Sequence, residues 1–475
     1  MNLIVNNQKY YDEILLIIKL FFQEDQLDLF DLNFDLNYVQ NNSNLSIFIK
    51  INGTYLNNEV KIDQTKTFNL TNLQLEKFDK YCKRYLKIEL YNQLCNITKK
   101  NMPWGSLTGI RPTKLFYELK KELNSSILAK TELINTFKVS PEKAEVVYNV
   151  TKNQTKIEIN DNLVDFYVNI PFCTSKCYYC SFISAPIASC LNYVEPYVDA
   201  LIKEIRAAKQ IINKKNYIVK TIYVGGGTPT AISPELLDKI LSELTYPVNE
   251  FTVEAGRPDT ITKEHLDILK KHNVTRISIN PQTFSNKTLK AIGRNHTSEE
   301  VIKAFELAKP YNFIINMDLI AGLNNESFNT FKNSLLKTIS LNPDNITVHT
   351  LSVKRTSKLS EGEGEKGKEQ DVIKMVNYAY KTLTDAGYNP YYLYKQKNMV
   401  GNLENLGYTK PNKECVFNID SMEEVATIVA CGANAITKRY FSLQNRIERN
   451  ANVKNLPDYI NRIDEIIAKK QEFFK

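Results

Sequence analysis

The stretch "FYVNIPFCTSKCYYCSF", residues 166–182, places Cys173, Cys177 and Cys180 in a C-x3-C-x2-C array. The apolar run before the array predicts a strand, so the cysteines come directly after a strand end. Thiolates at this spacing suit a thiophilic metal, either zinc or an iron–sulfur cluster. The other cysteines are scattered, which does not fit a secreted disulfide framework: Cys82, Cys95, Cys190, Cys415 and Cys431.

The number of clustered thiols distinguishes the two metals. Structural zinc requires four protein ligands, usually from two C-x2-C pairs, and no second pair follows here. The nearest further thiol is Cys190. A [4Fe-4S] cluster can be held by three cysteines when one iron stays open for an exogenous ligand. An open iron indicates chemistry rather than a structural role.

Length and composition favour a soluble enzyme of two or three domains, since the chain has 475 residues and 43% apolar content. The formal net charge of +8 is scattered, so we expect no nucleic-acid partner, and a polyanionic small molecule fits equally well. The apolar N-terminal run contains Lys19 and is flanked by acidic residues, which predicts neither a signal peptide nor a membrane span. We therefore expect a cytoplasmic protein.

Six strand-like runs alternate with helical stretches in the middle of the chain. The runs lie at residues 166–170, 221–226, 251–256, 276–282, 313–320 and 346–353. Helix starts are predicted at Ser233-Pro234-Glu235 and at the Thr297-x-x-Glu300 capping box. Such strands, nearly continuous in apolar residues, predict a parallel sheet buried on both faces. Right-handed crossovers would curl it into an open barrel of six βα units, with the active site at the carboxyl ends of the strands.

The predicted fold class is thus α/β, a partial (β/α)6 barrel with flanking domains. We expect an N-terminal α+β accessory domain at residues 1–155, the barrel core at 156–360 and a smaller, mainly helical C-terminal domain at 361–475. The hydrophilic segment "EGEGEKGKEQ", residues 361–370, predicts a linker or flexible loop leaving the barrel.

At this point the sequence resembles the radical S-adenosylmethionine (SAM) superfamily, whose signature is C-x3-C-x2-C after the first barrel strand. Further motifs are similar to the branch of oxygen-independent coproporphyrinogen III oxidase and the haem chaperones: "YVGGGTPT", "VEAGRPDTIT", "RISINPQTF", "IGRNHT" and "NMDLIAGL". The flanks "MPWGSLTGIRPTK" and "YLYKQKNMVGNLENLGY" resemble the HemZ type of coproporphyrinogen dehydrogenase. The resemblance covers most of the chain from about residue 100.

The resemblance implies that the three cysteines bind a [4Fe-4S] cluster and that SAM chelates the open iron. Tyr167 matches a tyrosine that contacts SAM, and Tyr179 matches the aromatic residue that lies against the adenine. Glycines let the backbone approach the methionine moiety of SAM. The matching loop residues are Gly226, Gly227 and Thr228.

Four polar residues match those that hydrogen-bond the ammonium, carboxylate and ribose groups of SAM: Glu254, Gln282, Arg294 and Asp318. A zwitterion with a diol needs an anionic acceptor and a cationic donor, which this set provides. Taken singly, Glu254 or Asp318 could instead pair with a barrel arginine, and Arg294 could simply precede a helix. His349 is left unassigned.

The family activity implied is the oxidative decarboxylation of coproporphyrinogen III to protoporphyrinogen IX in porphyrin and haem biosynthesis under anaerobic conditions. An electron donor such as flavodoxin or ferredoxin would reduce the cluster. SAM cleavage would then give a 5′-deoxyadenosyl radical that abstracts hydrogen from a propionate. A tetra-anionic tetrapyrrole substrate would need cations above the barrel rim, and the candidates are Arg257, Lys354 and Arg355.

The sequence departs from these relatives at two positions. Phe182 stands where the coproporphyrinogen oxidase extends its signature with a fourth cysteine, and Asn169 stands where relatives often have histidine. The haem motif of the chaperones, which contains tryptophan beyond the barrel, is missing, because Trp104 is the only tryptophan. A haem-trafficking protein and a radical SAM haem methylase therefore remain alternatives.

Overall fold

The computed structural model describes residues 2–22, 31–109, 111–154, 158–180, 185–352, 369–396 and 399–475. The chain divides into two compact units, Met1–Tyr148 and Asn149–Lys475. We expected a first boundary near residue 155 and a second near residue 360, whereas the barrel and all later residues form one unit.

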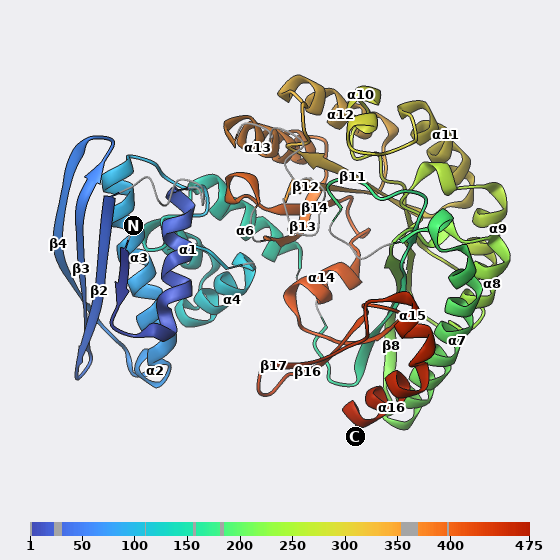
Figure 1. The fold of residues 1–475 in the computed structure, drawn as a ribbon, viewed down its shortest axis with the longest axis horizontal. Coiled ribbons are helices and arrows are strands. Elements are labelled where there is room, and N and C mark those ends of the chain that lie inside the picture. Colours follow the sequence, from blue (N-terminus) through green and yellow to red (C-terminus); the bar gives the residue numbers. More distant parts are fainter. Residues whose placement is uncertain are drawn as a thin grey trace. The chain divides into compact units, whose positions relative to one another are not determined.

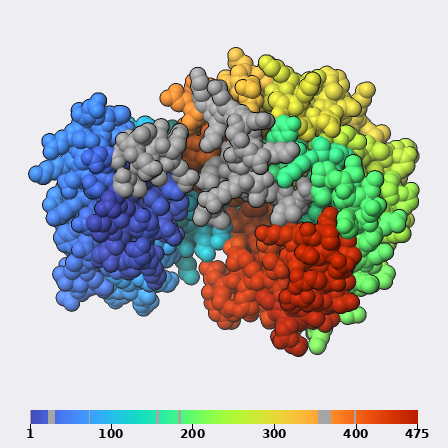
Figure 2. All heavy atoms as spheres, viewed as in Figure 1, coloured from blue at the N-terminus to red at the C-terminus, as the bar shows by residue number. Residues whose placement is uncertain are grey.

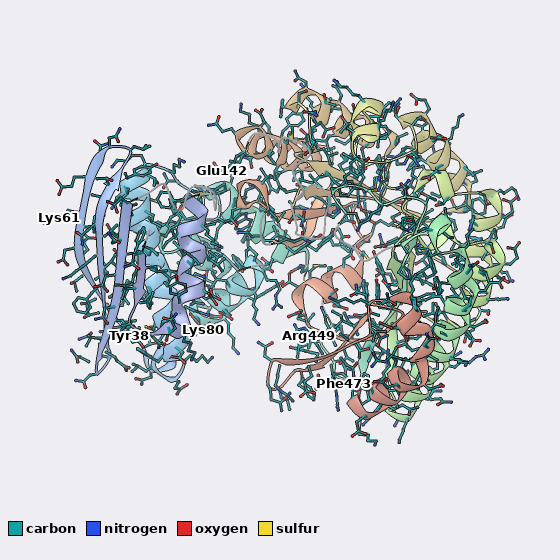
Figure 3. The ribbon with its side chains drawn as sticks, viewed as in Figure 1. Tyr38, Lys61, Lys80, Glu142, Arg449 and Phe473 are labelled. Carbon is teal, nitrogen blue, oxygen red and sulfur yellow. The ribbon has the colours of Figure 1, made fainter. Side chains whose placement is uncertain are left out.

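The first unit is a four-stranded sheet with helices against one face (Figure 1). Its strands are β1 (Asn2–Val5), β2 (Asp31–Asn41), β3 (Asn44–Tyr55) and β4 (Asn58–Asn69), in that spatial order. Tyr38 of β2 and Lys61 of β4 are labelled in Figure 3. The buried residues of β2 and β3 alternate along each strand, as a sheet covered on one face requires.

The helices of this unit are α1 (Tyr11–Phe21), α2 (Asn72–Glu76), α3 (Phe78–Thr98), α4 (Pro112–Leu123) and α5 (Ser126–Asn135), followed by α6 (Pro141–Asn153), which continues past residue 148. Apolar residues of α1 and α3 complete one core with the sheet. Trp104 is fully buried.

Six parallel strands form the centre of the second unit, as the sequence predicts. They are β5 (Leu163–Ile170), β8 (Ile218–Gly226), β9 (Glu250–Val253), β10 (Arg276–Ser278), β11 (Ile314–Ala321) and β12 (Asn345–Thr350). Each strand pairs with the next in this order, and every pairing is parallel. Two short strands, β6 (Phe172–Cys173) and β7 (Ala185–Pro186), form a separate pair beside the end of β5.

Helices cover the outside of these strands (Figure 1). They are α7 (Leu191–Lys214), α8 (Pro234–Leu241), α9 (Lys263–Lys271), α10 (Asn286–Ala291), α11 (Ser298–Ala308) and α12 (Phe328–Leu341). Ser233 caps α8, and Thr297 with Glu300 forms a capping box on α11, so both predicted helix starts are confirmed. Strands and helices share one large apolar core.

The residues after 369 extend this sheet at both edges, which gives eleven strands in all. At one edge, β13 (Asn389–Tyr394) and β14 (Asn405–Thr409) add antiparallel to β12. At the other, β15 (Thr427–Cys431) runs parallel to β5 and continues into β16 (Ile436–Phe441) and β17 (Arg446–Ala451). These strands satisfy the backbone groups at the edges of the six-stranded sheet, which explains why this region does not separate as its own unit.

The C-terminal helices are α13 (Glu369–Asp385), α14 (Val416–Glu423), α15 (Leu456–Asn461) and α16 (Ile463–Phe473). Helices α15 and α16 pack against α7, where red and green atoms adjoin in Figure 2. Arg439 of β16 donates a 3.3 Å hydrogen bond to the carbonyl of Phe473, which Figure 3 labels. No helix in the described part of the chain has the length and apolar character needed to cross a membrane.

Candidate functional site

A cavity of about 570 Å³ opens at the carboxyl ends of the barrel strands. It is lined by every predicted site residue that the structure describes: Tyr167, Cys173, Cys177, Tyr179, Cys180, Gly226, Gly227, Thr228, Glu254, Arg257, Gln282, Arg294 and Asp318. Lys354, Arg355 and Phe182 lie outside the described residues. Residues that are up to 151 positions apart in the sequence thus share one surface, because parallel strands present their carboxyl ends at the same edge.

The cysteine loop is tied to the barrel by backbone hydrogen bonds. Cys180 donates its N–H to the carbonyl of Cys177 over 3.1 Å, and Tyr178 donates to the carbonyl of Ile292 over 3.1 Å. The hydroxyl of Thr228 lies 3.5 Å from the Cys173 sulfur. None of the other five cysteines lines the cavity, and Cys190 instead donates its thiol to the Pro186 carbonyl over 3.3 Å.

Arg257 lies against this loop and is only 3% exposed. Its Nη1 lies 3.4 Å from the Cys177 sulfur, its Nη2 donates to the Ser175 hydroxyl over 3.2 Å, and its Nε donates to Asp259 over 3.1 Å. All three guanidinium nitrogens are thus engaged within the protein, which places positive charge beside the cysteine loop. Arg257 also lines the cavity, and its role as a substrate cation stays a prediction.

The donor set fits a cluster better than a single ion. Among the described residues, no three His, Cys, Asp or Glu side chains are placed to hold one metal ion. An iron–sulfur cluster takes each thiolate on a different iron, so its ligands stand farther apart. Three free thiols and two buried arginines, Arg257 and Arg294, line one cavity, which suits a cluster with anionic ligands.

The glycine loop after β8 approaches the backbone closely. Gly227 donates its N–H to the Ile170 carbonyl over 2.9 Å, and Thr228 donates to the Phe172 carbonyl over 2.6 Å. Gly226 has φ +102°, and a Cβ there would overlap the side-chain oxygen of Asn169. These two close approaches explain the glycines in physical terms.

Asn169, noted in the sequence only as a departure from relatives, organises this corner. Its Nδ2 donates to the Ala433 carbonyl over 2.7 Å, and its Oδ1 accepts from the Tyr167 hydroxyl over 2.9 Å. The Asn169 carbonyl accepts from Tyr197 over 2.7 Å. The amide thus links β5 to the turn after β15, and no local pattern around Asn169 indicates that distant contact.

Glu254 is a buried carboxyl directly after β9. Burial raises its pKa to about 7, although hydrogen bonds from Tyr223 and from the Gly226 backbone act in the opposite direction. Tyr223 was not predicted as a site residue, and its hydroxyl donates to Oε1 of Glu254. A carboxyl that changes charge near neutral pH suits a cationic ligand.

The pKa of Asp318 on β11 is shifted down, in the opposite direction to that of Glu254. Burial acts to raise its pKa, but a hydrogen bond and the charge of His349 outweigh burial, so the pKa lies below its ordinary value. His349 Nε2 lies 3.6 Å from Asp318 Oδ2, and Asn316 donates to Oδ1 over 2.8 Å. Asp318 therefore favours its ionised form, which is a hydrogen-bond acceptor.

Several buried polar atoms around the cavity have no hydrogen-bond partner among the described residues. They are Oε1 of Gln282, Nε of Arg294 and Oγ of Ser278. Gln282 also has a left-handed backbone, with φ +64°, and β10 ends at Ser278, before residue 282, where the sequence predicts its end. Buried polar groups need partners, and strained residues gather at functional sites, so this set fits a polar ligand such as SAM.

Arg294 and Tyr179 lie together beside the cysteines. Burial acts to lower the pKa of Arg294, but Tyr179 and Cys177 outweigh it and raise the pKa above its ordinary value. Arg294 Nη1 donates to the Asn280 carbonyl over 2.6 Å. Tyr179 packs against a small apolar cluster that includes Ile292 and Leu351. The guanidinium is therefore held rigidly as a charged donor.

The C-terminal wall of the cavity comes from elements that were not predicted as part of the site. It contains Tyr392 and Tyr394 of β13, Phe417 and Met422 of α14, and Lys438 of β16. The ring of Phe417 stacks on Tyr223 at 4.3 Å between centroids and on Tyr167 at 5.9 Å. Tyr392 and Tyr394 belong to the flank "YLYKQKNMVGNLENLGY", which resembles HemZ and was the available signal in the sequence.

Comparison with known proteins identifies the family of the chain. Residues 167–337 match the model of the radical SAM superfamily. The chain is 37% identical over 444 residues to the oxygen-independent coproporphyrinogen-III oxidase-like protein HemZ of Bacillus subtilis, covering 90% of this chain and 88% of that protein. It is 28% identical over 304 residues to the heme chaperone HemW of Buchnera aphidicola, covering 63% and 76% of the two chains.

The fold is also similar to that of coproporphyrinogen III oxidase (HemN) from Escherichia coli, a radical SAM enzyme. The TM-score is 0.51 at 21% identity, over 68% of this chain and 72% of that one. The resemblance and the α/β fold expected from the motifs are thus confirmed. Members of this superfamily use a [4Fe-4S] cluster and SAM, which are the cofactors of this chain. The chain belongs to the radical SAM superfamily, within the oxygen-independent coproporphyrinogen-III oxidase-like family that includes HemZ.

Proposed function

We propose that this protein is an oxygen-independent coproporphyrinogen III dehydrogenase, which converts two propionates of coproporphyrinogen III to the vinyl groups of protoporphyrinogen IX. The observation that carries the proposal is the 37% identity to a HemZ protein across 90% of the chain, together with a cavity lined by all three motif cysteines. At each propionate, the products are a vinyl group, CO₂, one hydrogen atom and one electron. A one-electron acceptor must take that electron.

In this proposal Cys173, Cys177 and Cys180 hold the cluster. When bound, the reduced cluster and SAM supply a one-electron oxidant that removes hydrogen from an unactivated C–H bond. The side chains of this protein bind and orient SAM: Glu254 accepts from its ammonium group, Arg294 donates to its carboxylate, and Asp318 accepts from its ribose. Gly226, Gly227 and Thr228 give it backbone partners, Tyr167 contacts it, Tyr179 covers its adenine, and Gln282 offers an unpaired amide oxygen.

The substrate side of the proposal rests on the C-terminal wall. Phe417 and Met422 give a flat, apolar surface on which a tetrapyrrole can lie, and the Tyr394 ring lies on the same wall. Lys438, whose Nζ also lies 3.6 Å from Oε1 of Glu424, is a cation on this wall that could bind a propionate carboxylate. We further propose a cytoplasmic protein working at low oxygen, with a flavodoxin or ferredoxin as the reductant of the cluster.

Haem trafficking is the second candidate, because heme chaperones of the HemW type also match the chain. Phe182 in place of a fourth motif cysteine favours this alternative. A stoichiometric haem spectrum that survives desalting would support it. A radical SAM haem methylase would instead add the mass of methyl groups to haem.

The test is anaerobic incubation of cluster-reconstituted protein with SAM, a strong reductant and coproporphyrinogen III, followed by tetrapyrrole mass. We expect stepwise loss of CO₂ from two propionates, abolished in Cys177→Ala and retained in Cys190→Ala. Formation of 5′-deoxyadenosine with no change in tetrapyrrole mass would overturn the proposed substrate while leaving the family assignment intact.

A further inference from the structure

The ring of Tyr223 packs in a cluster of three aromatic rings. Its centroid lies 6.1 Å from that of Tyr167 and 4.3 Å from that of Phe417, with interplanar angles of 29° and 23°, and the Tyr167 and Phe417 rings also stack on each other at 5.9 Å. From this position on β8 its hydroxyl donates to Oε1 of Glu254, which follows the neighbouring strand β9. The packed ring thus presents one hydroxyl to the buried carboxyl.

Phe417 is fixed in turn by the start of β9. Its backbone N–H donates to Oε1 of Glu250 over 2.9 Å, and that of Val416 donates to Oε2 over 2.7 Å. Glu250 therefore binds the first N–H groups of α14, where a negative charge also complements the helix dipole. Glu250 begins β9 and Glu254 follows its end, so one strand anchors both the helix and the carboxyl.

We propose that Tyr223, held by Phe417, is a positioning residue that orients the Glu254 carboxylate toward the ammonium group of SAM. The proposal rests on the assignment of Glu254 to SAM, made above, and not on the identity of the tetrapyrrole. The proposal connects SAM binding to α14. Three residues that follow Phe417 in this helix line the same cavity: Asn418, Ser421 and Met422.

The hydroxyl matters because the carboxyl is buried. Burial raises the pKa of Glu254 to about 7, and the Tyr223 hydrogen bond acts against that rise. Without this donor, the carboxyl would be protonated over a wider pH range and would lose its attraction for an ammonium group. The other titratable groups that act on Glu254 are Tyr167, Tyr394, Asp318 and His349.

The test measures the dissociation constant of SAM by anaerobic calorimetry on cluster-reconstituted protein between about pH 6 and pH 9. Tyr223→Phe keeps the stacked ring and removes only the hydroxyl. We expect binding about tenfold weaker than wild type at neutral pH, from the loss of a hydrogen bond to a charged group. The deficit should shrink at high pH, where Glu254 ionises without help.

The matched control is Tyr246→Phe. Tyr246 packs edge-on against Phe166, with ring centroids 6.0 Å apart, its hydroxyl has no partner in the described part of the chain, and it does not line the cavity. This variant should bind SAM as wild type does at every pH. A weakening of equal size for the two variants would overturn the proposal.

A double-mutant cycle separates positioning from general damage. In a Glu254→Gln background, SAM binding should lose its pH dependence, and Tyr223→Phe should add no further weakening. Phe417→Leu keeps the Tyr223 hydroxyl but removes the aromatic ring that stacks on Tyr223, so it should also weaken SAM binding. This variant tests the proposal if Tyr223→Phe does not fold. Tyr223→Phe with wild-type affinity, or with a deficit that does not change with pH, would overturn the proposal. If the variants bind SAM as predicted but wild-type protein does not decarboxylate coproporphyrinogen III, only the proposed substrate is contradicted.

Discussion

The Arg257 guanidinium lies 3.4 Å from the Cys177 sulfur, through Nη1, while its Nε is bound to Asp259. A buried cation therefore contacts the loop of residues 173–180, which carries the predicted cluster ligands. Hydrogen bonds to cluster sulfurs and nearby net charge both adjust reduction potentials. We therefore expect the arginine to affect the ease of cluster reduction, whatever the substrate.

We predict that Arg257→Leu makes the cluster harder to reduce, because the electron-rich state loses a neighbouring positive charge. The measurement is the midpoint potential of the reconstituted protein, which should become more negative. The midpoint potential of Arg257→Lys should lie between those of wild type and Arg257→Leu. Lysine keeps the positive charge but cannot contact Cys177, Ser175 and Asp259 at once as the guanidinium does. Arg206→Leu removes a charge from an exposed ion pair with Glu243 and is the control. An unchanged potential in Arg257→Leu would show that the charge is screened.

Iron binding should depend on three of the eight cysteines. We predict that Cys173→Ala, Cys177→Ala and Cys180→Ala each lose most of the iron and sulfide after reconstitution, because each removes one of the three thiolates on the cavity. Cys190→Ala should retain wild-type content, since its thiol is turned to the Pro186 carbonyl. Elemental analysis of the purified variants makes the comparison. Iron loss in Cys190→Ala alone would contradict the ligand assignment.

Local patterns predicted much of this molecule because they report local physics. The C-x3-C-x2-C spacing, the glycine loop and the strand runs all mark features whose geometry is set within a few residues. The six strands are buried on both faces and are therefore rich in apolar residues, which made it possible to predict the parallel barrel. The resulting rim gathered residues from Tyr167 to Asp318 around one cavity, as the sequence analysis expected.

The remaining features of the fold and of the site could not be predicted from the sequence, because they depend on contacts between distant parts of the chain. Nothing local to Phe417 shows that it stacks on Tyr223, 194 positions away in the sequence. Arg257 follows a strand end, as a substrate cation would, and only the folded loop brings Asp259 and Cys177 to it. The C-terminal strands were not predicted for the same reason. A strand at the edge of a sheet forms because it pairs with a neighbouring strand, and that neighbour is distant in the sequence.

Gly226 should tolerate no side chain. We predict that Gly226→Ala loses SAM binding and costs about 1–3 kcal/mol of unfolding free energy, because φ is +102° and the new Cβ would overlap Asn169. Gly387→Ala is the matched control, since Gly387 also has a positive φ, +85°, but open space around it. It should lose some stability and keep SAM affinity. Calorimetric SAM titration and thermal unfolding of both variants give the answer, and equal SAM affinity in the two would refute the close-approach argument.

Glu326 gives a test of stability against pH that does not involve the cavity. The residue is 7% exposed, its carboxyl accepts a hydrogen bond from Thr283 over 2.6 Å, and burial raises the pKa of that carboxyl from 4.5 to about 7. The folded protein therefore holds this proton more tightly than the unfolded chain does. That stabilisation is fully present below about pH 4.5 and is lost as the pH rises through about 7.

Glu326→Gln should remove this pH dependence while keeping the acceptor for Thr283. We predict that the variant matches wild type near pH 4.5 and is more stable above pH 7, by up to roughly 3 kcal/mol, since each pKa unit corresponds to about 1.4 kcal/mol. Denaturant unfolding of the anaerobic apoprotein at several pH values measures the difference. Glu195→Gln, a change at an exposed position of α7, should leave the shape of the pH curve nearly unaltered. A Glu326→Gln variant that is less stable at high pH would mean that the carboxylate has a charged partner, and that burial does not control this group.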